Sequence, residues 1–247
     1  MKDKIYNIPV TDALKEGGEC PFCCMYSKLE QEAVEYMLGP SYMEADIRMD
    51  TNEIGFCNTH YDKMYEKQNR LGLALMLHTH LQKINYDLNS IKNSAQSTSG
   101  HKKSFFSKHK VNSENNTLQT IDYLNKIQSS CYICNRVDSM MQNYIDTFLF
   151  MWKKEKGFAD SFKQDTESKG FCIQHFSMLL SAAEKYFTAD LFNSFVSTIT
   201  EIQLQNLKRL EDELDWFIKK SDYRYNDEPW KTSKDVLPRA ILKISGN

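Results

Sequence analysis

The cysteines constrain this chain more than any other feature, because six of the seven belong to a phrase that occurs twice. Each copy begins with C-x-x-C and continues with G-F-C-x-x-H. The first copy consists of Cys20, Cys23, Cys57 and His60, and the second of Cys131, Cys134, Cys172 and His175. The copies differ by four residues in the spacer, since Cys20 and Cys131 are 111 residues apart and Cys57 and Cys172 are 115 apart. This agreement predicts an internal duplication.

Each copy contains the donor set of a structural zinc site, three thiolates and one imidazole. Residues three apart at the start of a helix lie on one face, so both side chains of a C-x-x-C or C-x-x-H pair can reach one point. A helix N-terminus also favours the thiolate form needed for ligation. We therefore expect two zinc ions per chain, each held by the four donors of one copy. The glycine of G-F-C allows a tight backbone entry, and its phenylalanine can shield the ion.

Other interpretations of the same cysteines remain open at this stage. Thiolate sets also bind iron–sulfur clusters. A C-x-x-C pair at a helix start is typical of thioredoxin-like redox proteins, although the βαβ pattern of that fold is missing. Unligated core cysteines are a further alternative. Cys24 follows Cys20 by one helical turn, but the second copy has Asn135 there, so we predict Cys23 as the ligand and Cys24 as a spare thiol.

The apolar residues recur with a helical period and no convincing strand pattern occurs, so we expect an all-α fold. One stripe follows the second C-x-x-C, and a longer one precedes the C-terminal segment. The first consists of Val137, Met141, Tyr144, Phe148 and Met151; the second of Val196, Ile199, Gln203, Leu207, Leu210, Leu214 and Phe217. His78, His80, Glu35 and Asp146 are expected to be ordinary core or surface residues.

The duplication and the composition together predict the organisation of the chain. Residues 1–92 and 117–221 are expected to form two helical units, each clamped by its own Cys₃His site. The segment 93–116 is rich in Ser, Asn, Lys and His and is expected to be a flexible polar linker. Residues 222–247 form a C-terminal extension, whose aromatic residues are expected to fold back onto the preceding helix.

Composition and motifs exclude several classes of function. The formal net charge of −2 argues against a nucleic-acid-coating protein. No run of 18 apolar residues is present, and the first residues lack the apolar stretch of a signal peptide. We therefore expect a cytoplasmic protein, not bound to a membrane, with reduced cysteines. No phosphate loop, G-x-S-x-G or H-E-x-x-H motif occurs, so an enzyme is not favoured.

The paired CPxC…GFCxxH phrases and the tail DYRYNDEPW…LPRAILKISG resemble a bacterial family of uncharacterised cytoplasmic proteins. The resemblance covers nearly the whole chain apart from the linker, and it implies no catalytic residues. The predicted function is a zinc-binding, non-enzymatic scaffold or adaptor for a protein partner still to be identified. The alternative is a redox or metal-dependent enzyme or sensor, with iron–sulfur or exchangeable-ligand zinc chemistry.

Overall fold

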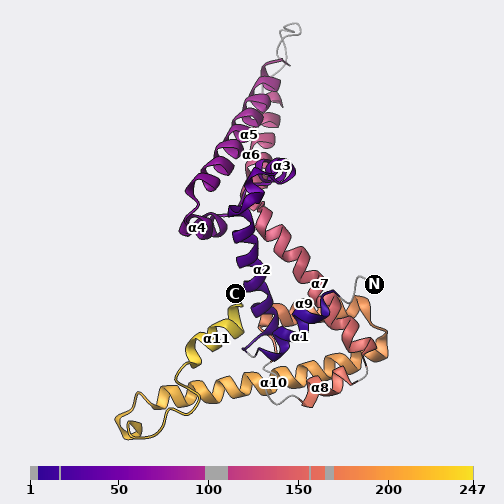
Figure 1. Cartoon of the computed structure of the whole chain (residues 1–247), viewed down its shortest axis with the longest axis vertical. Coiled ribbons are helices and arrows are strands. Elements are labelled where there is room, and N and C mark those ends of the chain that lie inside the picture. Colours follow the sequence, from indigo (N-terminus) through magenta and orange to yellow (C-terminus); the bar gives the residue numbers. More distant parts are fainter. Residues whose placement is uncertain (1–4, 17, 98–110, 156, 165–169, 247) are drawn as a thin grey trace. The chain divides into compact units, whose positions relative to one another are not determined.

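The computed structural model describes residues 5–16, 18–97, 111–155, 157–164 and 170–246. These residues form α-helices, short 3₁₀ helices and connecting turns, and none of them is in a strand (Figure 1). The expected all-α class is confirmed. No helix among the described residues is both long enough and apolar enough to cross a membrane.

The chain divides into two compact units. Unit 1 combines Met1–Leu29 with Ser139–Asn247, and unit 2 is the intervening segment Glu30–Asp138. The boundaries fall inside two helices, α2 (Pro21–Leu38) and α7 (Tyr132–Lys154). The compact units therefore do not coincide with the two copies of the cysteine phrase, because each unit contains parts of both.

Unit 1 is built around an aromatic core. Phe22, at the start of α2, stacks on Phe171 with ring centroids 5.4 Å apart, and both side chains are fully buried. Phe148 on α7 packs edge-on against both rings. Besides the parts of α2 and α7, the unit contains α1 (Asn7–Lys15), α8 (Phe158–Gln164), α9 (Ile173–Tyr186), α10 (Ala189–Lys219), η3 (Tyr223–Tyr225) and α11 (Val236–Ser245).

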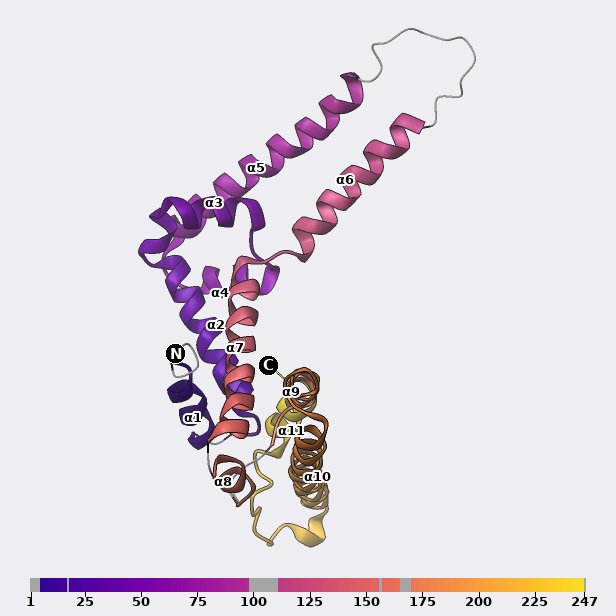
Figure 2. The ribbon, with the colours of Figure 1, turned by 90° about the vertical axis from the view of Figure 1, so that its right-hand side faces the viewer.

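Unit 2 has a smaller core of aliphatic and sulfur-containing side chains, including the buried Val34, Met37, Met64 and Met76. Its longest helix, α5, packs against both α3 and α6 (Figure 2). Besides the parts of α2 and α7, the unit contains η2 (Pro40–Met43), α3 (Ala45–Ile54), α4 (Asn58–Glu66), α5 (Arg70–Ser97) and α6 (Val111–Ser129).

The apolar stripes identify the buried helix faces well. Every residue of the α7 stripe is buried, and no residue of the α10 stripe is exposed. The predicted linker 93–116 is too long, because α5 extends to Ser97 and α6 begins at Val111. Polar residues alone do not end a helix, and residues 91–97 contain neither glycine nor proline. The rest of the predicted linker, residues 98–110, lies outside the described residues.

The C-terminal extension packs on unit 1, as its aromatic residues suggest. The rings of Trp216 and Tyr225 lie 6.1 Å apart, and those of Phe217 and Trp230 lie 5.7 Å apart. The indole of Trp216 donates a hydrogen bond to the carbonyl oxygen of Pro229 at 3.0 Å. The following helix, α11, contacts both α9 and α10. The extension is therefore an integral part of unit 1.

Candidate metal centres

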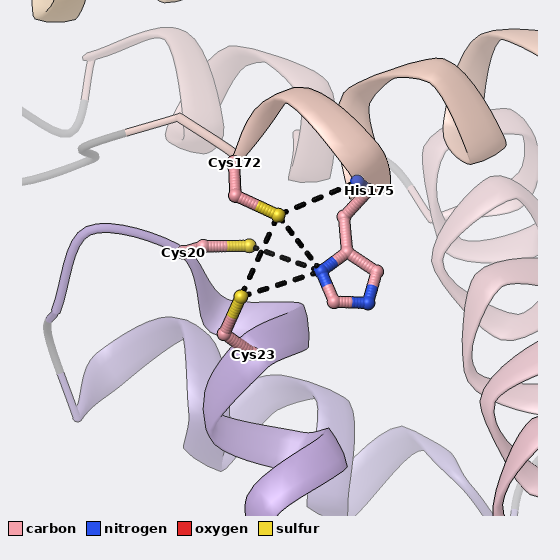
Figure 3. Close-up of side chains that lie close together, drawn as sticks. All are labelled: Cys20, Cys23, Cys172 and His175. Atoms are coloured by element: carbon pink, nitrogen blue, oxygen red, sulfur yellow. Dashed lines mark hydrogen bonds between the residues drawn. The ribbon is translucent and has the colours of Figure 1, made fainter. Parts of the chain in front are cut away.

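Four of the predicted ligands gather in unit 1 and are called cluster 1: Cys20, Cys23, Cys172 and His175 (Figure 3). The Nδ1 atom of His175 lies 3.6, 3.4 and 3.1 Å from the sulfurs of Cys20, Cys23 and Cys172, respectively. The sulfurs of Cys23 and Cys172 are 3.5 Å apart. All four residues are buried. One ion at the centre of this group can therefore reach four donors.

The other four predicted ligands gather in unit 2 and are called cluster 2: Cys57, His60, Cys131 and Cys134. The Nδ1 atom of His60 lies 3.2, 3.2 and 3.4 Å from the sulfurs of Cys57, Cys131 and Cys134, respectively. The sulfurs of Cys57 and Cys134 are 3.9 Å apart. Cluster 2 thus repeats the donor types and spacings of cluster 1, again with the histidine turned so that Nδ1 faces the sulfurs.

Each cluster forms where two helices begin. Cys20 and Cys131 immediately precede α2 and α7, and Cys57 and Cys172 are the N-cap residues of α4 and α9. The sulfur of Cys172 accepts a hydrogen bond from the backbone N–H of His175 at 3.4 Å. The free N–H groups and the dipole of a helix N-terminus stabilise negative charge. Four helix starts are therefore placed where they favour thiolates.

The glycine of each G-F-C phrase has a backbone requirement of its own. Gly55 has φ +68° and ψ −158°, a combination that is almost restricted to glycine, and Gly170 has φ +67°. A Cβ on Gly55 would collide with the buried ring of His80, and one on Gly170 would lie 2.7 Å from the side-chain oxygen of Gln203. The expected tight backbone entry is therefore present in both copies.

The expected pairing of the ligands within each copy is wrong. Cluster 1 joins the C-x-x-C of the first copy to the C-x-x-H of the second, and cluster 2 joins the other two pairs. Helix geometry supplies the reason. The helix that starts at Cys20 runs for 18 residues, so its far end lies ~27 Å from its start. The chain from Glu30 to Cys57 belongs to unit 2, whereas Cys20 belongs to unit 1.

The titration behaviour of cluster 1 reflects the crowding of its thiols. Hydrogen bonds from Cys20 and Cys23 hold the pKa of the Cys172 thiol far below its usual range, and the hydrogen bond to Cys172 raises the pKa of Cys23. Burial lowers the pKa of His175, but hydrogen bonds to Cys172 and Cys20 outweigh it and raise this pKa to about 9. A metal ion that binds these groups must displace their protons, so its affinity depends on pH.

In cluster 2 a carboxylate orients the histidine. His60 Nε2 lies 3.1 Å from Glu30 Oε1, and the other oxygen of Glu30 pairs with Lys63. Burial lowers the pKa of His60, which favours the neutral ring that a metal requires. A carboxylate on the distal nitrogen of a ligating histidine fixes its tautomer and increases its basicity. The sequence did not identify Glu30, because nothing in the order of residues distinguishes it from its glutamate neighbours.

A buried lysine lies beside cluster 1. Lys243 on α11 is fully buried, and its Nζ donates to the carbonyl oxygen of Glu19 at 2.6 Å. The carboxylate of Glu19 is also buried and pairs with Arg209 and with Arg239. Glu19 immediately precedes Cys20 in the chain, so this charged group lies beside cluster 1. Sequence reasoning missed Lys243, because lysine is seldom fully buried.

The remaining candidates have ordinary surroundings. The thiol of Cys24 stands outside both clusters and donates to Glu16 Oε2 at 2.8 Å, as expected of a spare thiol. His80 is buried, and its Nδ1 lies 2.7 Å from the carbonyl oxygen of Asn52. Glu35 and Asp146 are exposed and accept hydrogen bonds from glutamines on their own helices. These residues therefore act in packing and at the surface.

Comparison with known proteins identifies a family but no function. Among curated proteins and among solved structures, no match was found. A family model described as "Family of unknown function (DUF6062)" matches residues 1–247. The expected membership of a family without an assigned activity is confirmed over the whole length of the sequence. The chain therefore belongs to this family of unknown function, DUF6062.

Proposed function

We propose that this protein binds two structural zinc ions, one in each cluster, and acts as a non-enzymatic scaffold or adaptor. The observation that carries the proposal is the spacing of the donors. A tetrahedral zinc ion with ordinary bond lengths separates two sulfurs by ~3.8 Å and a sulfur from a nitrogen by ~3.5 Å. The sulfur–sulfur distances of 3.5 and 3.9 Å agree with a site of this size.

The same spacing favours zinc over the alternatives. A polynuclear iron–sulfur cluster places several atoms between its ligands and needs wider separations than those of a single ion. A redox C-x-x-C pair needs only two sulfurs, whereas here each pair meets a third cysteine and a histidine. Three cysteines and a histidine provide the closed shell of a structural zinc site, which leaves no coordination position for a substrate.

The scaffold role is supported by the surroundings of the clusters. Cluster 1 is enclosed by the core, with its four residues at most 4% exposed. A large pocket of unit 1, with a volume of about 840 Å³, is lined by residues of α7 and α9 and by none of the cluster residues.

An adaptor also implies a protein partner, which a pull-down from the native cell read by mass spectrometry would identify. None of the seven cysteines, which all lie among the described residues, forms a disulfide, and we propose a reducing, cytoplasmic location.

Metal content of paired variants tests the proposal and the crossed ligation together. Elemental analysis and native mass spectrometry of the wild-type protein should find two zinc ions per chain. The variant Cys20→Ser/Cys172→Ser alters one cluster and should keep one ion. The variant Cys20→Ser/Cys57→Ser alters both clusters and should keep none. Pairing within each copy would give the reverse result.

Cys24→Ser is the matched control, because it removes a thiol next to cluster 1 that belongs to neither cluster. This variant should keep both ions. Wild-type protein that carries iron with labile sulfide would instead support the iron–sulfur alternative. Wild-type protein without bound metal would refute the proposed function.

A further inference from the structure

The two clusters have the same donors but differ in exposure. In cluster 1 the exposed fractions of Cys20, Cys23, Cys172 and His175 are 2, 2, 0 and 4%. In cluster 2, His60 and Cys131 are equally buried, but Cys57 and Cys134 are half-buried. A thiolate reacts with solutes only where they can reach its sulfur. Cys57 and Cys134 are therefore the cluster cysteines that lie nearest to solvent, where a small reagent can approach.

The charged neighbours of the two clusters also differ. Beside cluster 1, the Nζ of the fully buried Lys243 donates to the carbonyl oxygen of Glu19, the residue before Cys20, at 2.6 Å and lies 3.7 Å from the Glu19 carboxylate, so this cation is paired. In cluster 2 the carboxylate of Glu30 lies on the distal nitrogen of His60 and also pairs with Lys63. A carboxylate in this position increases the basicity of the ligating histidine.

The sulfurs of these two half-buried cysteines also lie close together. Cys57 Sγ and Cys134 Sγ lie 3.9 Å apart, and a disulfide requires them to approach to ~2.05 Å. Cys57 lies at the start of α4, and Cys134 lies in the first turn of α7. Bond formation therefore requires these two sulfurs to move about 1.9 Å closer to one another.

We propose that cluster 2 is an oxidant-sensitive switch that releases its zinc ion when a hydroperoxide oxidises Cys57 and Cys134, whereas cluster 1 keeps its ion. The inference rests on the proposed function, since it requires zinc in both clusters. The two thiolates supply two electrons that break the O–O bond of hydrogen peroxide. One S–S bond forms, two protons from solvent complete two water molecules, and Zn²⁺ dissociates because two of its four ligands are lost.

The consequence of release is local to unit 2. Next to cluster 2, the backbone N–H of Tyr132 donates to the carbonyl oxygen of Gly55 at 2.9 Å, and the hydroxyl of Ser130 donates to that of Ile54 at 2.6 Å. These bonds tie the connection between α6 and α7 to the end of α3 and to Gly55, which follows it. Loss of the metal removes the ligation that holds these segments together, so α6 is expected to loosen.

The experiment treats the full-length zinc protein with hydrogen peroxide in the presence of a chromophoric zinc chelator. Zinc content is measured before the oxidant is added, so that fewer than two ions identifies a failure of the proposed function itself. The expected result is rapid release of one ion per chain and retention of the other. Peptide mapping without reduction should then find Cys57 joined to Cys134, and hydrogen exchange should increase in α6.

Cys24→Ser is again the matched control, because Cys24 is the third half-buried cysteine and lies outside both clusters. This variant should release one ion at the same rate as wild type. The inference is overturned if both ions leave together or neither leaves. It is also overturned if the disulfide contains a cysteine of cluster 1, or if Cys24→Ser abolishes the release.

Discussion

Gly170→Ala tests whether the close approach at the G-F-C phrase holds cluster 1 in place. The side chain of Gln203 on α10 clamps the backbone of Phe171, accepting from its N–H at 3.0 Å and donating to its carbonyl oxygen at 2.8 Å. Gly170 allows this approach because it has no Cβ; an added one would lie 2.7 Å from the Gln203 oxygen. Cys172 follows directly, so the clamp also positions a predicted ligand.

The cost of the substitution follows from these contacts. A left-handed backbone conformation costs an alanine ~1–2 kcal/mol. Displacing Gln203 leaves the N–H and the carbonyl of the fully buried Phe171 without partners, at ~1–3 kcal/mol each. Gly157 provides the matched control, because it lies in the same unit with φ +80° and a Cβ added there would meet nothing within 4 Å. Gly157→Ala should therefore cost only the backbone contribution.

Urea denaturation of the two variants, with hydrogen exchange of unit 1 peptides as a second readout, measures the difference. Gly170→Ala should lower the free energy of unfolding by ~2–6 kcal/mol more than Gly157→Ala, the contribution of the broken clamp. It should also speed release of metal from cluster 1. Equal destabilisation by the two substitutions would show that Gln203 moves aside without cost and would refute the reasoning.

Three further outcomes follow from the clusters. Glu30→Gln should weaken zinc binding at cluster 2 by about 10–100-fold in competition titrations, whereas the exposed Glu35→Gln should not. Cys172→Ser should increase hydrogen exchange mainly in unit 1, and Cys57→Ser mainly in unit 2. An equal increase of hydrogen exchange in both units for either variant would contradict the division into units. Acidification should release both ions, because protons compete with the metal for the thiolates and imidazoles, and an affinity independent of pH would exclude thiolate ligation.

The sequence predicts the members of the clusters because the relevant information is local. Two residues three apart at a helix start share a face in any tertiary structure, so C-x-x-C and C-x-x-H could be identified as donor pairs. Which C-x-x-C pair shares a cluster with which C-x-x-H pair is not decided by local sequence. Both copies present the same chemistry, so pairing within a copy and pairing between copies satisfy the same pattern. Only the length of α2 and the path of the chain through unit 2 decide between them.

The residues around the clusters were harder to predict for a related reason. Glu30 lies among several glutamates on α2, and only the fold brings it to His60. Lys243 is a lysine in an apolar helix, where composition predicts a solvent-exposed side chain, yet it is fully buried beside Glu19. Such positions depend on contacts between segments far apart in the chain, and periodicity within one helix does not report them.

Because the ligands are crossed between the copies, the chain loop that cluster 2 closes lies inside the loop that cluster 1 closes. This nesting predicts the order in which the two clusters form. Cluster 1 joins Cys23 to Cys172 across 149 residues, and the loop between Cys57 and Cys134 in cluster 2, which spans 77 residues, lies inside it. Closing cluster 2 first bridges Cys57 to Cys131 and shortens the loop of cluster 1 to about half. Each halving of a loop lowers its closure cost by ~0.6 kcal/mol, about a threefold gain in the equilibrium constant. Zinc added in limiting amounts to the refolding chain should therefore fill cluster 2 ahead of cluster 1. The assay is alkylation, which shows which cysteines the metal protects. Preferential protection of Cys20 and Cys172 would show that local packing in unit 1 outweighs loop closure.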